Sequence, residues 1–154
     1  MKIDIPGVPQ KFSALKAGSF FKKISNHKEF GLSVEMDGRL AAIVFPETGP
    51  HRLQIGGLPT NVVHYPEAIV RASPEFLGID EFAFGAVIKT EDGKSYIRVA
   101  DGPISFRTFD LQTGMYAGDL GDDVCKIHFG HWKVGALIDG EFSEIFGWKP
   151  TAQA

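Results

Sequence analysis

The chain has 154 residues, of which 44% are hydrophobic and 12% aromatic, and this composition excludes a disordered or fibrous protein. The net charge is −3 and the pI is near 5.9, so we expect no nucleic-acid partner held by phosphate contacts over the whole surface. The length suits one domain. We expect an extended lead-in over residues 1–18, a single β domain over 19–149 and a tail over 150–154.

Two absences in the sequence bear on its environment. The N-terminus has no apolar signal-like region, and no apolar run approaches the length of a membrane-spanning helix. The single cysteine, Cys125, has no partner for an internal disulfide. We therefore expect a cytoplasmic protein without membrane contact.

The first predicted elements are a strand over 19–26 and a hairpin around Asp37-Gly38. Phe12 and Leu15 precede them and are expected to anchor the lead-in. Asp-Gly favours a two-residue type I′ turn, which needs positive φ at both central residues. This turn pairs Met36 with Arg39, Val34 with Ala41, Leu32 with Ile43 and Phe30 with Phe45. The second strand of the hairpin, 40–45, is apolar on both faces, so we expect layers on both sides of it.

Residues 51–73 read as three short strands, at 52–55, 61–65 and 68–72. Gly56-Gly57, Pro59 and Pro66 separate them. Ser73-Pro74 has the pattern of a helix start, a capping residue followed by proline. We therefore expect at most one short helix, near 74–77.

Residues 82–110 contain two further Asp-Gly steps, Asp92-Gly93 and Asp101-Gly102. Treated as two-residue turns, they place Ile88 opposite Ile97, and Ile97 opposite Phe106, on one apolar face. This interpretation puts Phe106 in the core, with a bulge near 108. It also requires positive φ at Gly93 but not at Gly85.

A loop of about a dozen residues, 111–123, follows. Its aspartates and Asp110 form either a calcium site or a solvated turn with Asx hydrogen bonds. A strand is predicted over 124–129, and Asp139-Gly140 turns the last hairpin. That turn pairs Leu137 with Phe142, Val134 with Ile145 and His131 with Trp148.

These elements predict an all-β fold. The expected architecture is a single-domain barrel or two-sheet sandwich of about nine or ten short antiparallel strands, joined by hairpin and meander connections. Either arrangement limits the number of exposed sheet edges.

A candidate metal site lies in residues 122–131. Asp123, Cys125, His128 and His131 are ligand types that suit zinc or another transition metal. In a regular strand Cys125 and His128 point to opposite faces, and so do His128 and His131. The hypothesis therefore names Asp123, His128 and His131 and needs a bend in the chain. The alternative is a core thiol at Cys125 with two hydrogen-bonded histidines.

A second candidate site binds a ligand rather than a metal. His51, Arg52, His64 and Arg71 form a basic cluster that could receive a phosphate or carboxylate. The alternative is a solvated strand face paired with the acidic region 75–81. Two aromatic side chains complete the candidate set, Trp132 and Trp148, and Trp148 is the one we most expect to contact a partner.

The sequence favours a non-enzymatic binding or assembly module that needs no cofactor. We expect it to self-associate, with a dimer as the homo-oligomer, because a strand left at a sheet edge tends to pair with another chain. A small molecule or another protein is a further expected partner. The alternatives are a small-molecule-binding β-barrel with a cavity lined by some of the 13 phenylalanines, and a metal-binding protein or metal-dependent enzyme built on 122–131.

Overall fold

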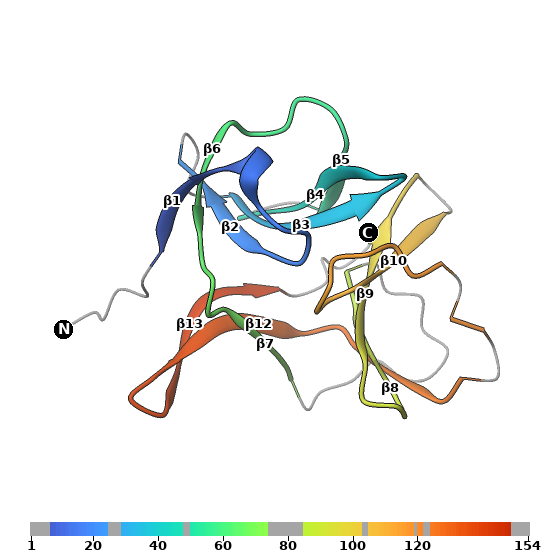
Figure 1. Ribbon diagram of the computed structural model, residues 1–154. Helices are drawn as coiled ribbons and strands as arrows, with labels where there is room; N and C mark the ends of the chain where they lie inside the picture. Colours follow the sequence, from blue (N-terminus) through green and yellow to red (C-terminus); the bar gives the residue numbers. More distant parts are fainter. Residues whose placement is uncertain are drawn as a thin grey trace.

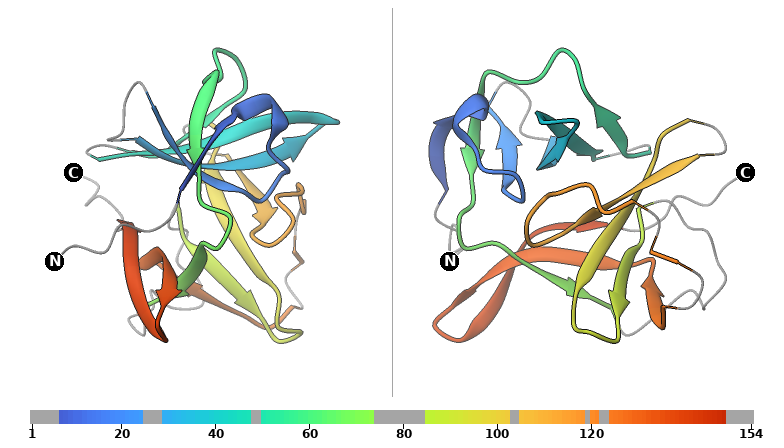
Figure 2. Two further views of the ribbon diagram at one scale, coloured as in Figure 1. Left: turned by 60° about the vertical axis from the view of Figure 1, so that its left-hand side comes forward. Right: turned by 45° about the vertical axis from the view of Figure 1, so that its right-hand side comes forward.

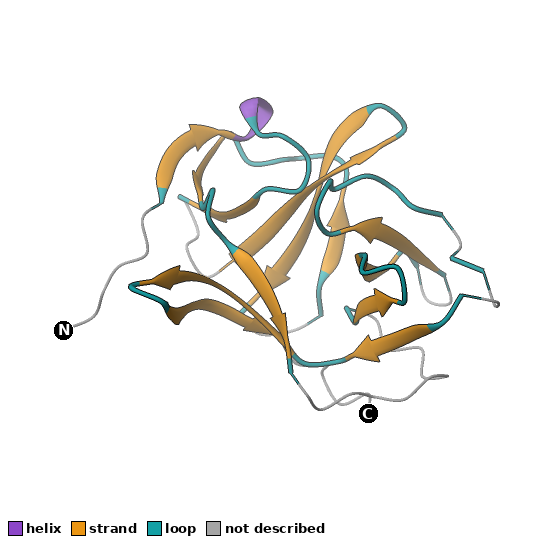
Figure 3. Cartoon of the chain, turned by 60° about the horizontal axis from the view of Figure 1, so that its bottom comes forward, coloured by secondary structure: helices purple, strands orange, loops and turns teal. Residues whose placement is uncertain are grey.

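The computed structural model describes residues 7–24, 29–47, 50–73, 85–102, 105–118, 120–121 and 124–148. Within these ranges 13 strands form three antiparallel sheets, and the one helical element is a 3-10 turn at Phe12–Ala14 (Figure 3). The all-β class is confirmed. The helix expected near 74–77 falls outside the described residues, as do the tail and Asp123. No helix among the described residues has the length and apolarity to cross a membrane.

The largest sheet has six strands in the order β1-β6-β2-β3-β4-β5 (Figure 1). Its strands are β1 (Val8–Lys11), β2 (Phe20–Lys23), β3 (Glu29–Met36), β4 (Arg39–Pro46), β5 (Arg52–Gln54) and β6 (Asn61–His64). Strand β1 pairs with β6, so the expected lead-in contributes an edge strand to this sheet. Strand β6 then pairs with β2, which brings the start of the chain beside residues about fifty positions later.

The β3–β4 hairpin has the predicted register. Asp37 and Gly38 have φ of 53° and 73°, as a type I′ turn requires. Phe30 lies opposite Phe45, and the other predicted pairs are also present. A two-residue turn leaves no freedom of register, so the local sequence was enough to specify eight pairs of facing residues.

The second sheet has four strands in the order β10-β9-β8-β11. Its strands are β8 (Val87–Thr90), β9 (Ser95–Ala100), β10 (Phe106–Asp110) and β11 (Lys126–Phe129). The predicted β8–β9 register is wrong by one residue. The Thr90 N–H donates to the Lys94 carbonyl at 3.1 Å, which leaves a three-residue loop, and Ile97 lies opposite Val87 instead of Ile88. Gly93, at φ 84°, is the left-handed residue that ends such a loop.

The predicted β9–β10 register is wrong by three residues. The Asp101 N–H donates to the Ser105 carbonyl at 2.9 Å, so the connection is longer than a two-residue turn. Phe109 therefore lies opposite Ile97 and is fully buried, while Phe106 is 40% exposed. Strand β10 keeps one register along its length, without the bulge expected near 108.

The third sheet has three strands in the order β13-β12-β7. Its strands are β7 (Ile69–Ala72), β12 (Trp132–Ile138) and β13 (Glu141–Trp148). Leu137 lies opposite Phe142, as predicted. A register shift at Val134/Gly135 then changes the remaining pairs, so that Trp132, and not His131, lies opposite Trp148.

None of the three sheets closes on itself (Figure 2). The barrel alternative is therefore wrong, and the packing of open sheets agrees with the sandwich alternative, with three sheets in place of two. The core between the sheets includes Phe30, Phe45, Ile97 and Trp132.

A second apolar cluster covers the other face of the six-stranded sheet. Phe12 and Leu15, from the 3-10 turn and the residue after it, are 3% and 7% exposed and pack with Phe21 and Val44. Both expected anchors are confirmed. Burying a side chain the size of Phe12 stabilises the fold by about 1.5–3 kcal/mol. Strand β4 consequently has layers on both faces, as its apolar sequence predicts.

Candidate functional site

Three of the six predicted ligand-binding residues come together in the core. Trp132 and Trp148 lie opposite each other on β12 and β13, with ring centroids 6.4 Å apart. The imidazole of His51 packs against Trp148 at 5.5 Å. All three side chains are buried and contact Phe45. Their role in ligand binding stays a prediction, and the contacts seen are those of core packing.

His51 also joins two sheets by a hydrogen bond. Its Nε2 accepts the Ala100 N–H at 3.0 Å, which ties the residue before β5 to the end of β9. Burial lowers the pKa of His51 to about 4. The ring is therefore neutral at pH 7, and because Nε2 is an acceptor the proton is on Nδ1.

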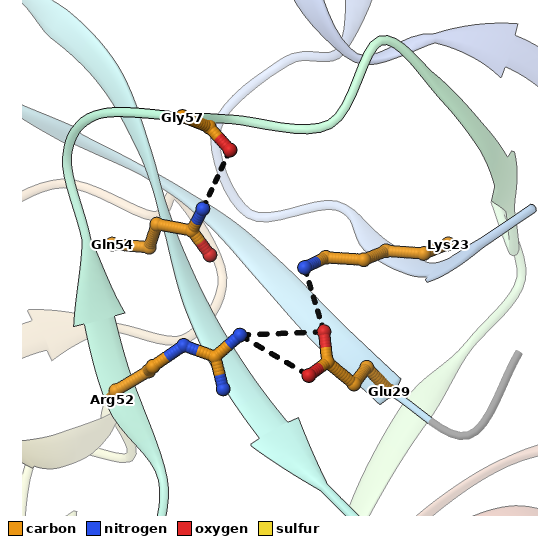
Figure 4. A network of polar contacts seen from close by, with 5 residues as sticks. All are labelled: Lys23, Glu29, Arg52, Gln54 and Gly57. Atoms are coloured by element: carbon orange, nitrogen blue, oxygen red, sulfur yellow. Dashed lines mark hydrogen bonds and ion pairs between the residues drawn. The ribbon is translucent and has the colours of Figure 1, made fainter. Parts of the chain in front are cut away.

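The remaining three basic residues do not form the expected cluster. Arg52 pairs with Glu29 at 3.2 Å, and Glu29 also binds Lys23 at 2.6 Å (Figure 4). These cations lower the pKa of Glu29, with the hydrogen bond from Lys23 as the largest cause. His64 Nδ1 lies 3.1 Å from the side-chain oxygen of Gln10 on β1, and three strands separate its strand from β5.

Arg71 lies on another sheet from Arg52 and His64. Its guanidinium carbon is 4.5 Å from the ring centroid of Phe142, on β13. The basic cluster is thus distributed over separate strands, each member with its own contact. Local sequence patterns could not reveal this separation, because it results from which strands pair with one another in each sheet.

The predicted metal ligands are only partly within the described residues. His128 is buried on β11, His131 is half-buried in the link to β12, and Asp123 lies outside the described ranges. Among the residues that are described, no three His, Cys, Asp or Glu side chains are grouped to hold a metal ion. The metal hypothesis stays a prediction. Cys125 is exposed, which corrects the expectation of a core thiol, because it precedes an edge strand of the four-stranded sheet.

The start of the predicted acidic loop is a compact turn. One carboxylate oxygen of Asp110 accepts the N–H groups of Gln112 and Thr113, at 2.8 and 3.0 Å. This is the hydrogen-bonding pattern of an Asx turn. The three other aspartates of the proposed calcium site lie outside the described residues.

A cleft of about 330 Å³ lies where the three sheets meet. This volume is at the lower end of the range for small-ligand sites, roughly 300–1,000 Å³. The residues that line it come from all three sheets and their connections: Gly18, Phe20, Ala68, Ile69, Val70, Ala72, Val87, Lys89, Gly93, Ser95, Leu111 and Gln112. We call it the three-sheet cleft.

One wall of the three-sheet cleft is the inner face of the four-stranded sheet. Lys89 lies opposite Ser95, and the Leu111 N–H donates to the Ser95 carbonyl at 2.9 Å, so these residues form one row across the sheet. Lys89 and Val87 share a face because side chains alternate along a strand. Val87 is buried in the core. The cleft therefore begins at the row where the core ends.

The opposite wall is the edge strand β7, whose one partner among the described strands is β12, so we call its other side the open edge of β7. The Ser73 N–H donates to the His131 carbonyl at 2.8 Å, so Ser73 is a hydrogen-bonded position of the ladder. In an antiparallel ladder such positions alternate. The N–H and C=O groups of Val70 and Ala72 therefore point away from β12. Both residues line the three-sheet cleft. Among the described residues, no backbone hydrogen bond from a turn or loop reaches the N–H or C=O group of either residue.

The three-sheet cleft thus combines backbone donors and acceptors with apolar side chains and one lysine. Sequence reasoning missed Phe20, Val70, Ala72 and Lys89. One signal was present, because a lysine at the position after Val87-Ile88 shares a strand face with Val87. The open edge of β7 had no local signal, since it results from the order of strands in the sheet.

No protein-family model matches this chain, and no curated protein or solved structure is significantly similar to it.

Proposed function

We propose that the protein is a non-enzymatic binding module that takes up an extended polypeptide segment of a partner protein at the open edge of β7. One observation carries the proposal. The N–H and C=O groups of Val70 and Ala72 point away from β12, and both residues line a cleft that also contains the apolar side chains of Phe20, Val87 and Leu111. An extended segment added to such an edge satisfies the backbone groups and buries alternate side chains at once.

The two sets of side chains on an added strand would meet different surroundings. One set would face the inside of the three-sheet cleft, near Phe20, Val87 and Leu111. The other would lie on the face of the three-stranded sheet that carries Arg71, which is exposed and does not line the cleft. Strand addition would therefore select segments with an apolar residue at alternate positions.

The energies indicate where the selectivity would arise. Two N–H and two C=O groups offer up to about four hydrogen bonds, each worth about 1 kcal/mol net. Association itself costs several kcal/mol, at least about 4. The hydrogen bonds alone are thus too weak, and burial of side chains in the apolar part of the three-sheet cleft would decide which segments bind.

The proposal includes a cytoplasmic location, which rests on the single cysteine. It commits to a segment of another protein as the occupant of the three-sheet cleft. Self-association is distinguishable by native mass spectrometry. A dimer that disappears in the Ala72→Pro variant would identify the occupant as a second copy of this chain.

The test is a displayed library of random short peptides, panned in parallel on the wild-type protein, Ala72→Pro and Ala72→Ser. Proline at position 72 removes an N–H that the β7–β12 ladder does not use, so the fold should persist while the edge loses a donor. Serine keeps the N–H and is the matched control. We expect peptides with alternating apolar residues that bind wild type and Ala72→Ser, and bind Ala72→Pro at least tenfold more weakly.

Two outcomes would overturn the proposal. One is a library that yields no enriched sequence on folded wild-type protein. The other is enrichment that is equal on wild type and Ala72→Pro, which would place the binding surface elsewhere. Thermal unfolding of all three proteins checks that Ala72→Pro is folded before the comparison is made.

A further inference from the structure

The walls of the three-sheet cleft differ in polarity from one end to the other. At the β7 end the lining is apolar, with Phe20, Ile69 and Val70. At the other end Lys89 and Ser95 lie opposite each other on adjacent strands. The next row of the same sheet face is buried and apolar, so the polar groups gather at one end.

Lys89 is the cation among the residues that line the three-sheet cleft. Its ammonium nitrogen lies 5.9 Å from the ring centroid of Phe129, on the neighbouring strand β11. The ion pairs found among the described residues involve Lys23, Arg52, Arg107 and Lys133, and none of them includes Lys89. Its side chain is exposed, so the charge is hydrated and accessible to a ligand.

An exposed lysine usually needs no explanation. Lys89 differs because strand alternation places it on the same sheet face as buried Val87, and both residues line the three-sheet cleft together with residues of β7. Its hydroxyl-bearing neighbour Ser95, across the strand pair, could donate a second hydrogen bond to the same anionic group.

We propose that the segment bound at β7 carries a carboxylate that pairs with Lys89, either from an Asp or Glu side chain or from the end of the chain. This inference rests on the proposed function and adds the charge of the ligand to it. The apolar part of the cleft selects alternate apolar residues, and Lys89 selects an acidic group at one end of the bound segment. A charged hydrogen bond of this kind contributes more than a neutral one.

The experiment uses peptides recovered from the library that depend on Ala72. Each is synthesised in its original form, with Asp and Glu changed to Asn and Gln, and with a free or amidated C-terminus. Calorimetry measures their affinity for wild type, Lys89→Met and Lys94→Met. Lys94 is exposed in the same β8–β9 hairpin but does not line the three-sheet cleft, so Lys94→Met is the matched control.

We expect Lys89→Met to weaken the acidic peptides about tenfold or more and the neutral forms little, with Lys94→Met close to wild type. The peptide series identifies the bound carboxylate. If it is a side chain, the Asn and Gln peptides will bind wild type and Lys89→Met equally; if it is the end of the chain, the peptides with an amidated C-terminus will do so. The inference is overturned if Lys89→Met has no effect, or weakens acidic and neutral peptides equally. Binding that depends on Ala72 but not on Lys89 would leave the proposed function standing and remove only this inference.

Discussion

The indole Nε1 of Trp132 donates a hydrogen bond of 2.7 Å to the carbonyl oxygen of Gly85. Trp132 begins β12 and Gly85 precedes β8, so this bond joins the three-stranded sheet to the four-stranded sheet. The N–H of Gly85 donates to the Arg98 carbonyl at 2.6 Å, and its φ is 81°. A Cβ at this position would lie 2.5 Å from Nε1 of Trp148. Only glycine therefore fits at position 85, where the two sheets meet. This corrects the expectation that Gly93 needs positive φ and Gly85 does not.

Alanine at position 85 should destabilise the protein much more than alanine at position 93. Both glycines have positive φ, which costs an alanine about 1–2 kcal/mol. Around Gly93 a Cβ would meet no atom within 4 Å, whereas at Gly85 it would overlap the indole of Trp148. We expect a loss of about 1 kcal/mol for Gly93→Ala and at least about 3 kcal/mol for Gly85→Ala, measured by urea unfolding. Equal losses would show that the two indoles do not constrain Gly85.

The stability of the protein should fall between pH 7 and pH 5 because of His51. Its pKa is about 4 when folded and 6.5 in the unfolded chain, so the unfolded chain binds a proton over this range that the folded protein does not. The contribution of neutral His51 to the free energy of unfolding is therefore fully present above pH 6.5 and is lost as the pH falls toward 4. The expected loss from this one group at pH 5 is about 2 kcal/mol.

The His51→Gln variant isolates this contribution. An amide oxygen can accept the Ala100 N–H in place of Nε2, and the amide does not titrate. Urea unfolding gives the free energy of unfolding at pH 7 and at pH 5. The decrease between these two pH values should be about 2 kcal/mol smaller in the variant than in the wild-type protein. The same pH dependence in both proteins would mean that His51 is protonated without cost in the folded state.

Replacing Arg52 by alanine should have little effect on stability and none on peptide binding. Its side chain is 46% exposed and its guanidinium pairs with Glu29, which keeps Lys23 as a second partner. Exposed ion pairs of this type contribute about 0.2–1 kcal/mol. We expect a loss below about 1 kcal/mol in urea unfolding, and unchanged affinity for peptides recovered from the library. A large loss of affinity would restore Arg52 as a ligand-binding residue.

The four Asp-Gly steps show what the sequence could and could not predict. At Asp37-Gly38 and Asp139-Gly140 both residues have positive φ, and the predicted pairs beside each turn are present. At Asp92 and Asp101 the aspartate is not in that region, and the connections are longer. Aspartate before glycine suits both a two-residue type I′ turn and a longer connection, so the dipeptide alone did not determine the register.

The candidate site was harder to predict than the hairpins because its walls are distant in sequence. Phe20, Val70 and Lys89 each belong to a different sheet, and they approach one another only after the sheets have packed. The alternation of side chains along each strand predicts on which face of its sheet each of these residues lies. The open edge of β7 depends on which strands pair, and local patterns do not contain that information.

Amide hydrogen exchange at β7, followed by NMR, tests the proposed strand addition most directly. In the free protein we expect Ile69 and Arg71 to exchange slowly, because they bond to β12, and Val70 and Ala72 to exchange fast. Adding a library-selected peptide should slow the exchange of Val70 and Ala72 specifically. If these two amides are already protected in the free protein, or remain fast when the peptide is bound, the open edge of β7 is not the binding site.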